Sequence, residues 1–166
     1  MIKRLKRIKA IALDVDGVLT DGTYWWGVDG SEMKRFCFSD GTGITMAMRA
    51  GLLVALISGE SSEAGMTLVQ RYADKLKIKN TYKGCHDKAA AVKEFAKKHG
   101  LELYEICFIG DDVIDVPALS IVGFPVVPAD AHASSRAKAH YVTKKRGGRG
   151  VVREVIDLVM EQRGLG

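Results

Sequence analysis

The chain has 166 residues, of which 47% are hydrophobic and 27% charged, and its formal net charge is +5 at pH 7. This length suits one compact domain, and the composition excludes an intrinsically disordered chain and a membrane-embedded one. Basic residues dominate 1–10 and 131–153, whereas acidic residues outnumber basic ones over 11–130. We therefore predict neither a nucleic-acid partner nor a membrane partner, because no single basic face emerges.

The cysteines and the N-terminus bear on the compartment. The three cysteines follow no spacing typical of a disulfide framework or a metal site. Residues 8–13 superficially resemble the apolar part of a signal peptide, but Asp14 and Asp16 interrupt the run. We expect a reduced protein of the cytoplasm.

Strands and helices alternate along most of the chain. A short apolar strand over 10–15 precedes a predicted hairpin, whose strands at 23–26 and 33–38 flank the Asp29-Gly30 turn. The pattern then predicts helices at 41–50, 62–76, 87–99, 113–120, 131–137 and 150–162, separated by strands at 52–57, 81–82, 106–109, 122–127 and 140–143. Because the strands are continuous apolar runs, we predict an α/β fold with a parallel sheet covered by helices on both faces.

Polar residues suited to phosphoryl chemistry follow the carboxyl ends of the predicted strands or begin the next helix. The set comprises Asp14, Asp16, Ser58, Gly59, Lys88, Asp111, Asp112 and Asp115. Carboxylates gathered at a buried strand end need a cation, and Mg²⁺ prefers such oxygen ligands. A hydroxyl, a glycine N–H and an ammonium group suit phosphoryl oxygens. Each motif alone also fits a helix cap or a solvated loop, but four in order predict a phosphoryl-transfer site.

These motifs resemble those of the haloacid dehalogenase (HAD) phosphatases. Asp14-Val15-Asp16-Gly17 resembles the first motif, and Ser58, Lys88 and 110–115 resemble the second, third and fourth. Residues 8–160 are similar to the subgroup that includes 3-deoxy-D-manno-octulosonate 8-phosphate (KDO 8-phosphate) phosphatase. The stretches 40–44, 127–131 and 147–154 also carry this similarity, and the last two narrow the resemblance to this subgroup.

The resemblance implies the overall architecture. It points to a Rossmann-like HAD fold forming a single capless domain over residues 1–166. A β-hairpin insertion is expected at 22–38, after the first strand, and a C-terminal helix and tail at 147–166. A homotetramer and a place in lipopolysaccharide biosynthesis are also implied.

A two-step reaction follows from the same resemblance. Asp14 is expected to form an aspartyl phosphate, while Asp16 acts first as general acid and then as general base. Ser58 and Lys88 are expected to stabilise the phosphoryl oxygens. The small-molecule substrate is a phosphorylated 3-deoxy-2-ulosonic acid.

The resemblance also implies how the Mg²⁺ cofactor is held. Its expected ligands are the Asp14 carboxylate, the Asp16 backbone carbonyl and Asp111. Asp112 and Asp115 are expected to hold water molecules or to orient Lys88.

Two residues complicate the choice of substrate. After Ser58 and Gly59, Glu60 stands where the octulosonate enzymes usually carry arginine, and it resembles the branch acting on nine-carbon sugar acid 9-phosphates (KDN or sialic acid). Lys75 resembles the basic partner in that branch. Glu60 equally suits a solvated acid in the first turn of a helix. We expect Gly59, Glu60 and Lys75 to bind substrate, and the chain length of that substrate stays open.

The predicted hairpin and the basic C-terminal stretch bear on assembly. Trp25 and Trp26 are adjacent, so their rings face opposite sides of a strand and at least one needs cover. We expect a subunit contact to supply it, and packing on the same domain is the alternative. By resemblance, Arg149 or its neighbours reach the active site of an adjoining subunit. Residues 144–146 are expected to form a solvated basic turn.

Three other functions share part of this pattern. A signalling receiver domain also combines an aspartate, a lysine and Mg²⁺, but it carries no acid two residues after the acceptor, as Asp16 stands here. A catalytically idle assembly module should lack the nucleophile or the metal-binding acids. Processing of nucleic-acid ends is disfavoured by the acidic segment over 11–130.

Overall fold

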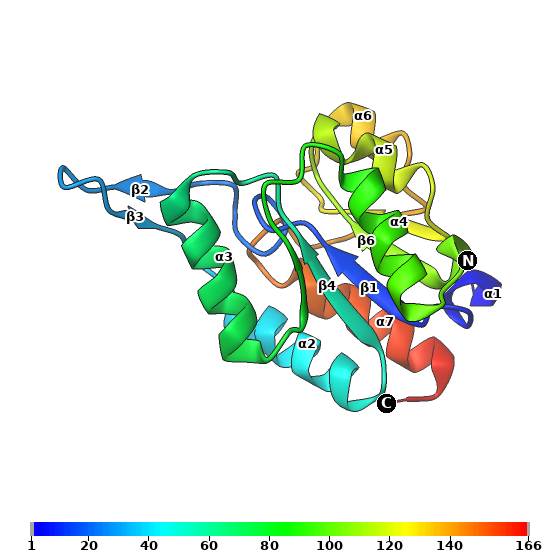
Figure 1. Ribbon diagram of the computed structural model, residues 1–166. Helices are drawn as coiled ribbons and strands as arrows, with labels where there is room; N and C mark the ends of the chain where they lie inside the picture. Colours follow the sequence, from blue (N-terminus) through cyan, green and yellow to red (C-terminus); the bar gives the residue numbers. More distant parts are fainter. Residues whose placement is uncertain (1, 166) are drawn as a thin grey trace.

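The computed structural model describes residues 2–165, and its core is a six-stranded, all-parallel sheet (Figure 1). The strands are β1 (Ala10–Leu13), β4 (Leu53–Ile57), β5 (Asn80–Tyr82), β6 (Ile106–Ile109), β7 (Phe124–Val127) and β8 (Tyr141–Val142), in the order β5-β4-β1-β6-β7-β8. The register pairs Leu13 with Leu56 on one side and with Ile109 on the other. The chain segments that follow β1, β4 and β6 therefore emerge together at the carboxyl edge of the sheet.

Helices cover both faces of the sheet, as predicted. On one face, Ile11 and Leu13 pack with residues of α2 (Phe38–Arg49), α3 (Glu63–Leu76) and α7 (Val151–Arg163). On the other, Ala10 and Ala12 pack with α4 (Lys88–His99) and α5 (Val116–Leu119). Successive β1 residues alternate between the two clusters because strand side chains point to opposite faces in turn. Within residues 2–165, no helix combines the length and the apolar character needed to cross a bilayer.

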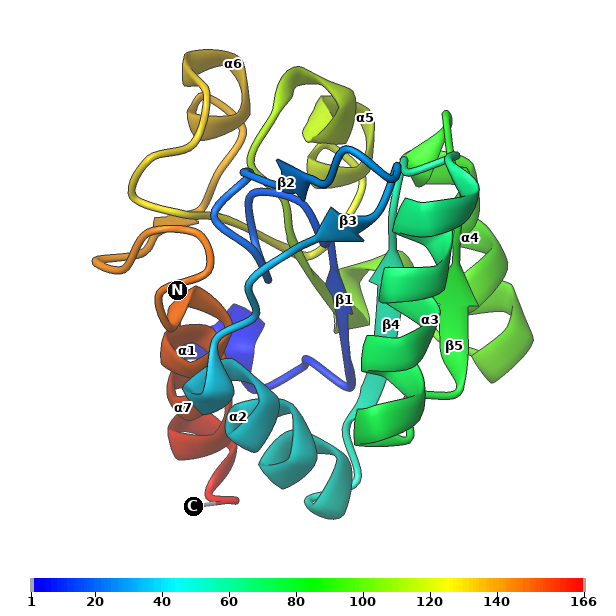
Figure 2. The same cartoon turned by 90° about the vertical axis from the view of Figure 1, so that its left-hand side faces the viewer.

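A two-stranded hairpin projects from the body beside the carboxyl edge (Figures 1 and 2). We call residues 22–37 the arm. Its strands β2 (Trp25–Trp26) and β3 (Glu32–Met33) pair antiparallel. These strands are shorter than the predicted 23–26 and 33–38, because the returning chain instead contacts the body. There Arg35 binds Asp21 at 2.8 Å and the Phe36 ring stacks on Tyr72.

The basic N-terminal segment forms a short helical turn attached to the body of the fold. Residues Ile2–Leu5 form the helical turn α1, and Leu5 is fully buried against the body. The neighbouring Lys3 and Arg4 remain exposed. One apolar side chain thus anchors this basic segment. The predicted domain also includes residues 1 and 166, which lie outside the described residues.

Two helical predictions were imprecise at their boundaries. Helix α2 begins at Phe38, three residues before the predicted start, and contains Gly41 and Gly43 in its first half. A Cβ atom on Gly43 would lie 2.9 Å from the Arg153 side chain, so this glycine lets α2 approach α7 closely. The predicted helix over 113–120 is a 3₁₀ turn, η2 (Val113–Asp115), followed by α5. The short helices η1 (Leu103–Glu105) and α6 (Ala133–Arg136) complete the described fold.

Candidate active site

A pocket of about 430 Å³ opens at the carboxyl edge of the sheet, beside the arm. Its lining brings together seven of the predicted residues, namely Asp14, Asp16, Gly59, Glu60, Lys88, Asp111 and Asp112. Gly22, Tyr24, Lys34 and Ile114 complete the lining. Because β1, β4 and β6 end at the same level, motifs that are far apart in the sequence meet here.

The inner end of the pocket is built on a buried lysine between two aspartates. The Lys88 ammonium lies 2.6 Å from Asp14 Oδ1 and 2.6 Å from Asp115 Oδ1, and its side chain is 1% exposed. Burial alone would lower the pKa of Lys88, but the charges of Asp14 and Asp115 outweigh burial and raise it. Lys88 therefore carries a fixed positive charge beside Asp14.

Asp115 orients Lys88, which is one of the two roles predicted for it. Besides its ion pair, Asp115 accepts hydrogen bonds through Oδ2 from the backbone N–H groups of Asp111 and Asp112. The Asp112 carboxylate accepts from the N–H of Val113 and caps η2. Both residues thus shape the loop after β6.

The donor set at this end fits a divalent cation. Oxygens of Asp14, Asp111 and Asp115 lie within 4.8 Å of one another. Asp115 is already engaged through both oxygens, whereas the buried Asp111 Oδ1 has no hydrogen-bond partner among residues 2–165. Asp14 and Asp111 are therefore the carboxylates suited to Mg²⁺.

Burial gives these two carboxylates unusual proton affinities. It raises the pKa of Asp14 well above its ordinary value, although Lys88 opposes the shift. Burial, assisted by the charge of Asp115, raises the pKa of Asp111 to about 6. A bound cation would favour the ionised form of both side chains and remove much of this cost.

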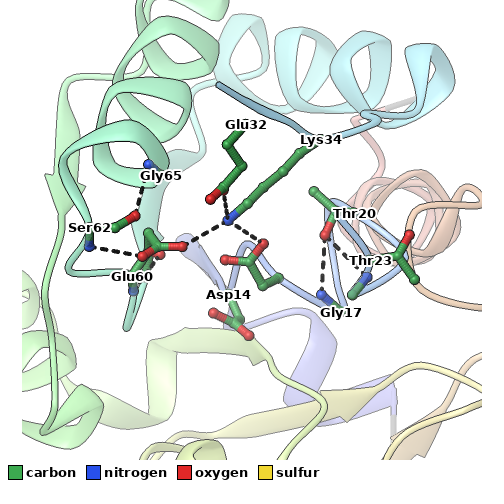
Figure 3. A network of polar contacts seen from close by, with 12 residues as sticks. Asp14, Gly17, Thr20, Thr23, Glu32, Lys34, Glu60, Ser62 and Gly65 are labelled. Atoms are coloured by element: carbon green, nitrogen blue, oxygen red, sulfur yellow. Dashed lines mark hydrogen bonds and ion pairs between the residues drawn. The ribbon is translucent and has the colours of Figure 1, made fainter. Parts of the chain in front are cut away.

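The loop after β1 requires a glycine where it meets Asp111. Gly17 has a φ of +88°, and a Cβ atom there would lie 2.1 Å from Asp111 Oδ2. The loop is closed by Thr20, whose hydroxyl oxygen accepts from the N–H groups of Gly17 and Gly22 (Figure 3). This tight turn carries Asp16 to the pocket beside Asp14.

The outer end of the pocket is organised by Lys34 of the arm. Its ammonium group lies 3.0 Å from Asp16 Oδ1, 3.0 Å from Glu60 Oε2 and 3.4 Å from Glu32 Oε1. Figure 3 shows the Lys34 side chain reaching between Glu32 and Glu60. Although burial disfavours its charge, these acidic partners raise the pKa of Lys34. This residue joins the arm to the predicted catalytic loop.

Glu60 is a paired residue of the pocket and not a solvated acid in a first helical turn. Helix α3 begins after it, at Glu63, with Ser62 as the cap. Glu60 Oε1 accepts from the N–H of Ser62, while Oε2 binds Lys34. Burial raises the pKa of Glu60, but these hydrogen bonds outweigh it and lower the pKa below its usual value. Glu60 is therefore a fixed negative group on the pocket wall.

Three predicted residues lie elsewhere. Ser58 is fully buried, and its hydroxyl oxygen accepts from the N–H of Glu60. Lys75 lies in the last turn of α3, roughly 18 Å along the helix axis from Glu63, and lines a separate pocket with Phe36 and other residues. The Arg149 side chain is 62% exposed and lies 4.0 Å from Asp21. Lys75 and Arg149 do not reach the carboxylate pocket of their own chain.

The stretches that carry the similarity to this subgroup form hydrogen bonds that hold the C-terminal segment in place. Asp40 is fully buried and accepts hydrogen bonds from the N–H groups of Gly150 and Arg153 at the start of α7. Nearby, the N–H of Gly147 donates to Asp130. The N–H of Gly148 donates to the Val18 carbonyl in the catalytic loop. These motifs hold the C-terminal segment against the loop that carries Asp14 and Asp16.

Sequence reasoning missed Lys34 and Tyr24. Lys34 lies between Met33 and Arg35 in a predicted hairpin strand, where a lysine ordinarily faces solvent. Its burial depends on how the arm folds back over the loop after β1. The sequence carries no signal for that contact, because the two segments are brought together only by the tertiary fold.

The chain is similar in sequence to a known hydrolase family and to curated phosphatases. Residues 44–155 match the haloacid dehalogenase-like hydrolase family. The 3-deoxy-D-manno-octulosonate 8-phosphate phosphatase of Yersinia pestis is 39% identical over 160 residues, covering 96% of this chain and 83% of that protein. The enzyme of the same name from Escherichia coli (strain K12) is 38% identical over 164 residues, with coverages of 99% and 85%.

Solved structures show the same fold. The 3-deoxy-D-manno-octulosonate 8-phosphate phosphatase from Moraxella catarrhalis, in complex with a magnesium ion, a phosphate ion and a KDO molecule, is 36% identical with a TM-score of 0.93. The similarity covers 98% of this chain and 91% of the Moraxella catarrhalis chain. The cobalt-bound enzyme from Haemophilus influenzae is 34% identical with a TM-score of 0.90, and the coverages are 97% and 92%. The predicted α/β fold is confirmed by these similarities.

Proposed function

We propose that this chain removes the phosphate of KDO 8-phosphate in a Mg²⁺-dependent reaction. The chain belongs to the haloacid dehalogenase-like hydrolase family and is a phosphatase like its relatives. The observation that carries the proposal is the buried Lys88 between Asp14 and Asp115, next to the unpartnered oxygen of Asp111. This arrangement combines a nucleophile, a fixed cation and a metal-binding oxygen. An assembly module without catalytic activity would not require this arrangement.

The reaction begins with an attack by Asp14. One of its carboxylate oxygens bonds to phosphorus as the bond from phosphorus to the sugar oxygen breaks, and Asp16 gives its proton to that leaving oxygen. Asp16 then takes a proton from water, whose oxygen attacks phosphorus and releases Asp14 and inorganic phosphate. Lys88 stays beside Asp14 throughout and stabilises the charge on the phosphoryl oxygens.

The proposed Mg²⁺ ligands are the carboxylates of Asp14 and Asp111 and the backbone carbonyl of Asp16. When bound, the ion supplies positive charge to the phosphoryl oxygens. Chelation with EDTA should abolish activity, and added Mg²⁺ should restore it. Mg²⁺ should also raise the melting temperature of the wild type more than that of Asp111→Asn. Full activity of a metal-free preparation would contradict this assignment.

The substrate is supported by two observations of different kind. The relatives reported above are named for KDO 8-phosphate, and the outer end of this pocket offers polar groups for a sugar acid. Tyr24 and Glu60 line this end, and both can form hydrogen bonds with sugar hydroxyls. Glu60 also stands where the octulosonate enzymes usually carry arginine. The activity on a nine-carbon sugar acid 9-phosphate should therefore be compared with that on KDO 8-phosphate.

The decisive experiment compares kcat/KM for KDO 8-phosphate, KDN 9-phosphate and p-nitrophenyl phosphate. We expect KDO 8-phosphate to exceed KDN 9-phosphate by about tenfold or more, as differential contacts to a sugar commonly allow. A preference for the nine-carbon ester would overturn the substrate assignment. Failure of both esters to exceed p-nitrophenyl phosphate would overturn the substrate class and leave the hydrolytic reaction standing.

The proposal extends to a cytoplasmic homotetramer that assembles through the arm. Trp25 and Trp26 are 54% and 71% exposed, so neither ring is covered by its own domain. Such a patch of exposed aromatic surface is typical of a protein contact. The three cysteines form no disulfide within residues 2–165, which is compatible with a reducing compartment.

A further inference from the structure

Lys34 has the surroundings of a functional ammonium group. Its side chain is 2% exposed, yet it lies within 3.4 Å of three carboxylates, those of Asp16, Glu32 and Glu60. An ion pair used only for stability needs one partner, and burying an ammonium group costs several kcal/mol before pairing. Two of the three partners, Asp16 and Glu60, line the active-site pocket, as does Lys34 itself.

The two residues that follow Lys34 hold it at this place. Its sequence neighbour Arg35 binds Asp21 of the catalytic loop at 2.8 Å. The next residue, Phe36, stacks on Tyr72 with ring centroids 4.2 Å apart, which ties the arm to α3. The backbone at Lys34 is thus attached both to the loop that carries Asp16 and to the helix that follows Glu60.

We propose that Lys34 is a positioning residue that aims the proposed general acid Asp16 at the leaving oxygen. The inference rests on the proposed function, because it assumes that Asp16 transfers a proton to the sugar. Lys34 binds Asp16 through Oδ1 at 3.0 Å. Asp16 Oδ2 is then the oxygen that carries the proton and releases it as the bond between phosphorus and the sugar oxygen breaks.

The same ammonium group links this acid to the pocket wall. Glu60 Oε2 is held by Lys34 at 3.0 Å, while the N–H of Ser62 fixes Oε1 at 2.9 Å. The carboxylates of Asp16 and Glu60 therefore keep a set separation, with Lys34 between them. A sugar that fits against Glu60 is placed with its ester oxygen toward Asp16.

The test uses two leaving groups that differ in their need for an acid. Departure of an alkyl alkoxide from KDO 8-phosphate or glucose 6-phosphate requires a proton, whereas p-nitrophenolate departs readily without one. In Lys34→Met, kcat/KM for the alkyl esters should fall by about 100-fold, the size of a general-acid contribution. For p-nitrophenyl phosphate it should fall by less than about threefold. Lys34→Arg keeps the charge and should recover part of the alkyl activity.

The ratio of the two kcat/KM values is independent of how much enzyme is folded, since inactive protein lowers both values equally. Lys93→Met is the matched control, because it makes the same substitution at an exposed lysine of α4 outside the lining of the pocket. The control should leave the ratio unchanged. An equal loss with both leaving groups in Lys34→Met, or no loss with the alkyl esters, would overturn the proposal.

Failure of this inference can be told from failure of the proposed substrate. If KDO 8-phosphate proves a poor substrate of the wild type, glucose 6-phosphate still reports the alkyl-to-aryl ratio. The substrate assignment then fails while the role of Lys34 is still measured. A normal substrate preference with an unchanged ratio in Lys34→Met overturns the role of Lys34 alone.

Discussion

Two buried lysines organise opposite ends of the same pocket. Lys88 begins α4 in the body of the fold, and both of its carboxylate partners lie 2.6 Å away at the ends of central strands or just beyond. Lys34 belongs to the arm, and its partners in the pocket lie 3.0 Å away on two separate loops. The inner end, where we propose that the phosphate binds, is thus built by the sheet, whereas the outer end depends on an insertion.

In the proposed function, this difference separates the residues of the phosphoryl-transfer step from those that contact the sugar. Residues at the ends of β1 and β6 are fixed by strand pairing, so the relative positions of Asp14 and Asp111 follow from the register that pairs Leu13 with Ile109. The arm contributes only two-residue strands and is attached through side chains such as Arg35 and Phe36. An insertion of this kind can change in sequence without disturbing the sheet that carries the reaction.

The largest expected effect is at the body end, in Asp14→Asn. The amide cannot attack phosphorus, so kcat should fall on the order of 10⁴-fold or more, as for other removed nucleophiles. Stability should be retained or increased, because burial already disfavours the charge of Asp14. Steady-state kinetics and a thermal melt measure the two quantities. Full activity in this variant would remove Asp14 as the nucleophile.

The two lysines should differ in their contribution to stability. Lys88→Met leaves two buried carboxylates without their cation and should lower the free energy of unfolding by about 3–5 kcal/mol. Lys34→Met should cost less, about 1–2 kcal/mol, because Asp16 is 38% exposed and water can solvate it. Urea unfolding measures both. The exposed Lys93 of the same helix α4 provides the control, and Lys93→Met should change stability by less than about 0.5 kcal/mol. Equal losses at Lys88 and Lys34 would contradict the distinction between body and arm.

The oligomeric state of an arm variant tests whether the outer surface of the arm forms a subunit contact. Burying roughly 100 Å² of the Trp26 ring in a subunit contact would contribute about 2.5 kcal/mol per subunit. Trp26→Ser should therefore shift the tetramer toward smaller species at low protein concentration, as measured by light scattering. Tyr104→Ser, which removes an exposed aromatic ring outside the arm, should leave the molar mass unchanged. An unchanged tetramer in Trp26→Ser would exclude this ring from the contact.

The smallest effect concerns the ion pair that attaches the arm to the catalytic loop. Hydrogen bonds from Thr23 and Arg35 lower the pKa of Asp21 to about 2. The resulting stability is present above about pH 4 and is lost as the pH falls toward 2, because protonation removes the favoured charged form. Asp21→Asn should cost about 1 kcal/mol at neutral pH, after allowance for solvent screening, and less near pH 3. Urea unfolding at the two pH values measures the difference, and a cost independent of pH would contradict it.

The body of the fold was more predictable than the arm. Strand β6 has the bounds that its apolar run predicted, and β1 and β4 differ from the prediction by one or two residues. Their four- and five-residue runs are buried, so local hydrophobicity marks them. The start of α2 was predicted three residues too late, because residues up to Phe38 were assigned to a hairpin strand, whereas Phe38 is the first residue of the helix.

Sequence motifs identified the pocket residues at the ends of strands and helices. They did not identify Lys34, which reaches the pocket only because the arm folds back over the loop after β1. Asp14, Asp16, Lys88 and Asp111 stand at strand or helix ends, where sequence position alone places them at one edge of a parallel sheet. Lys75 resembled a binding residue by its position in a motif, but α3 carries it away from the carboxylate pocket. Lys34 showed no motif at all.

The sequence by itself determined the alternating α/β order, the parallel sheet and the carboxylates at its carboxyl edge. These features follow from local apolar runs and from the rule that parallel strands end together. Only the tertiary structure decided which carboxylates each lysine pairs with, and that Glu60 is paired instead of solvated. It also decided that Asp111 Oδ1 has no hydrogen-bond partner among residues 2–165. Such pairings depend on contacts between segments far apart in the chain, and no local pattern encodes the distance between two charged atoms.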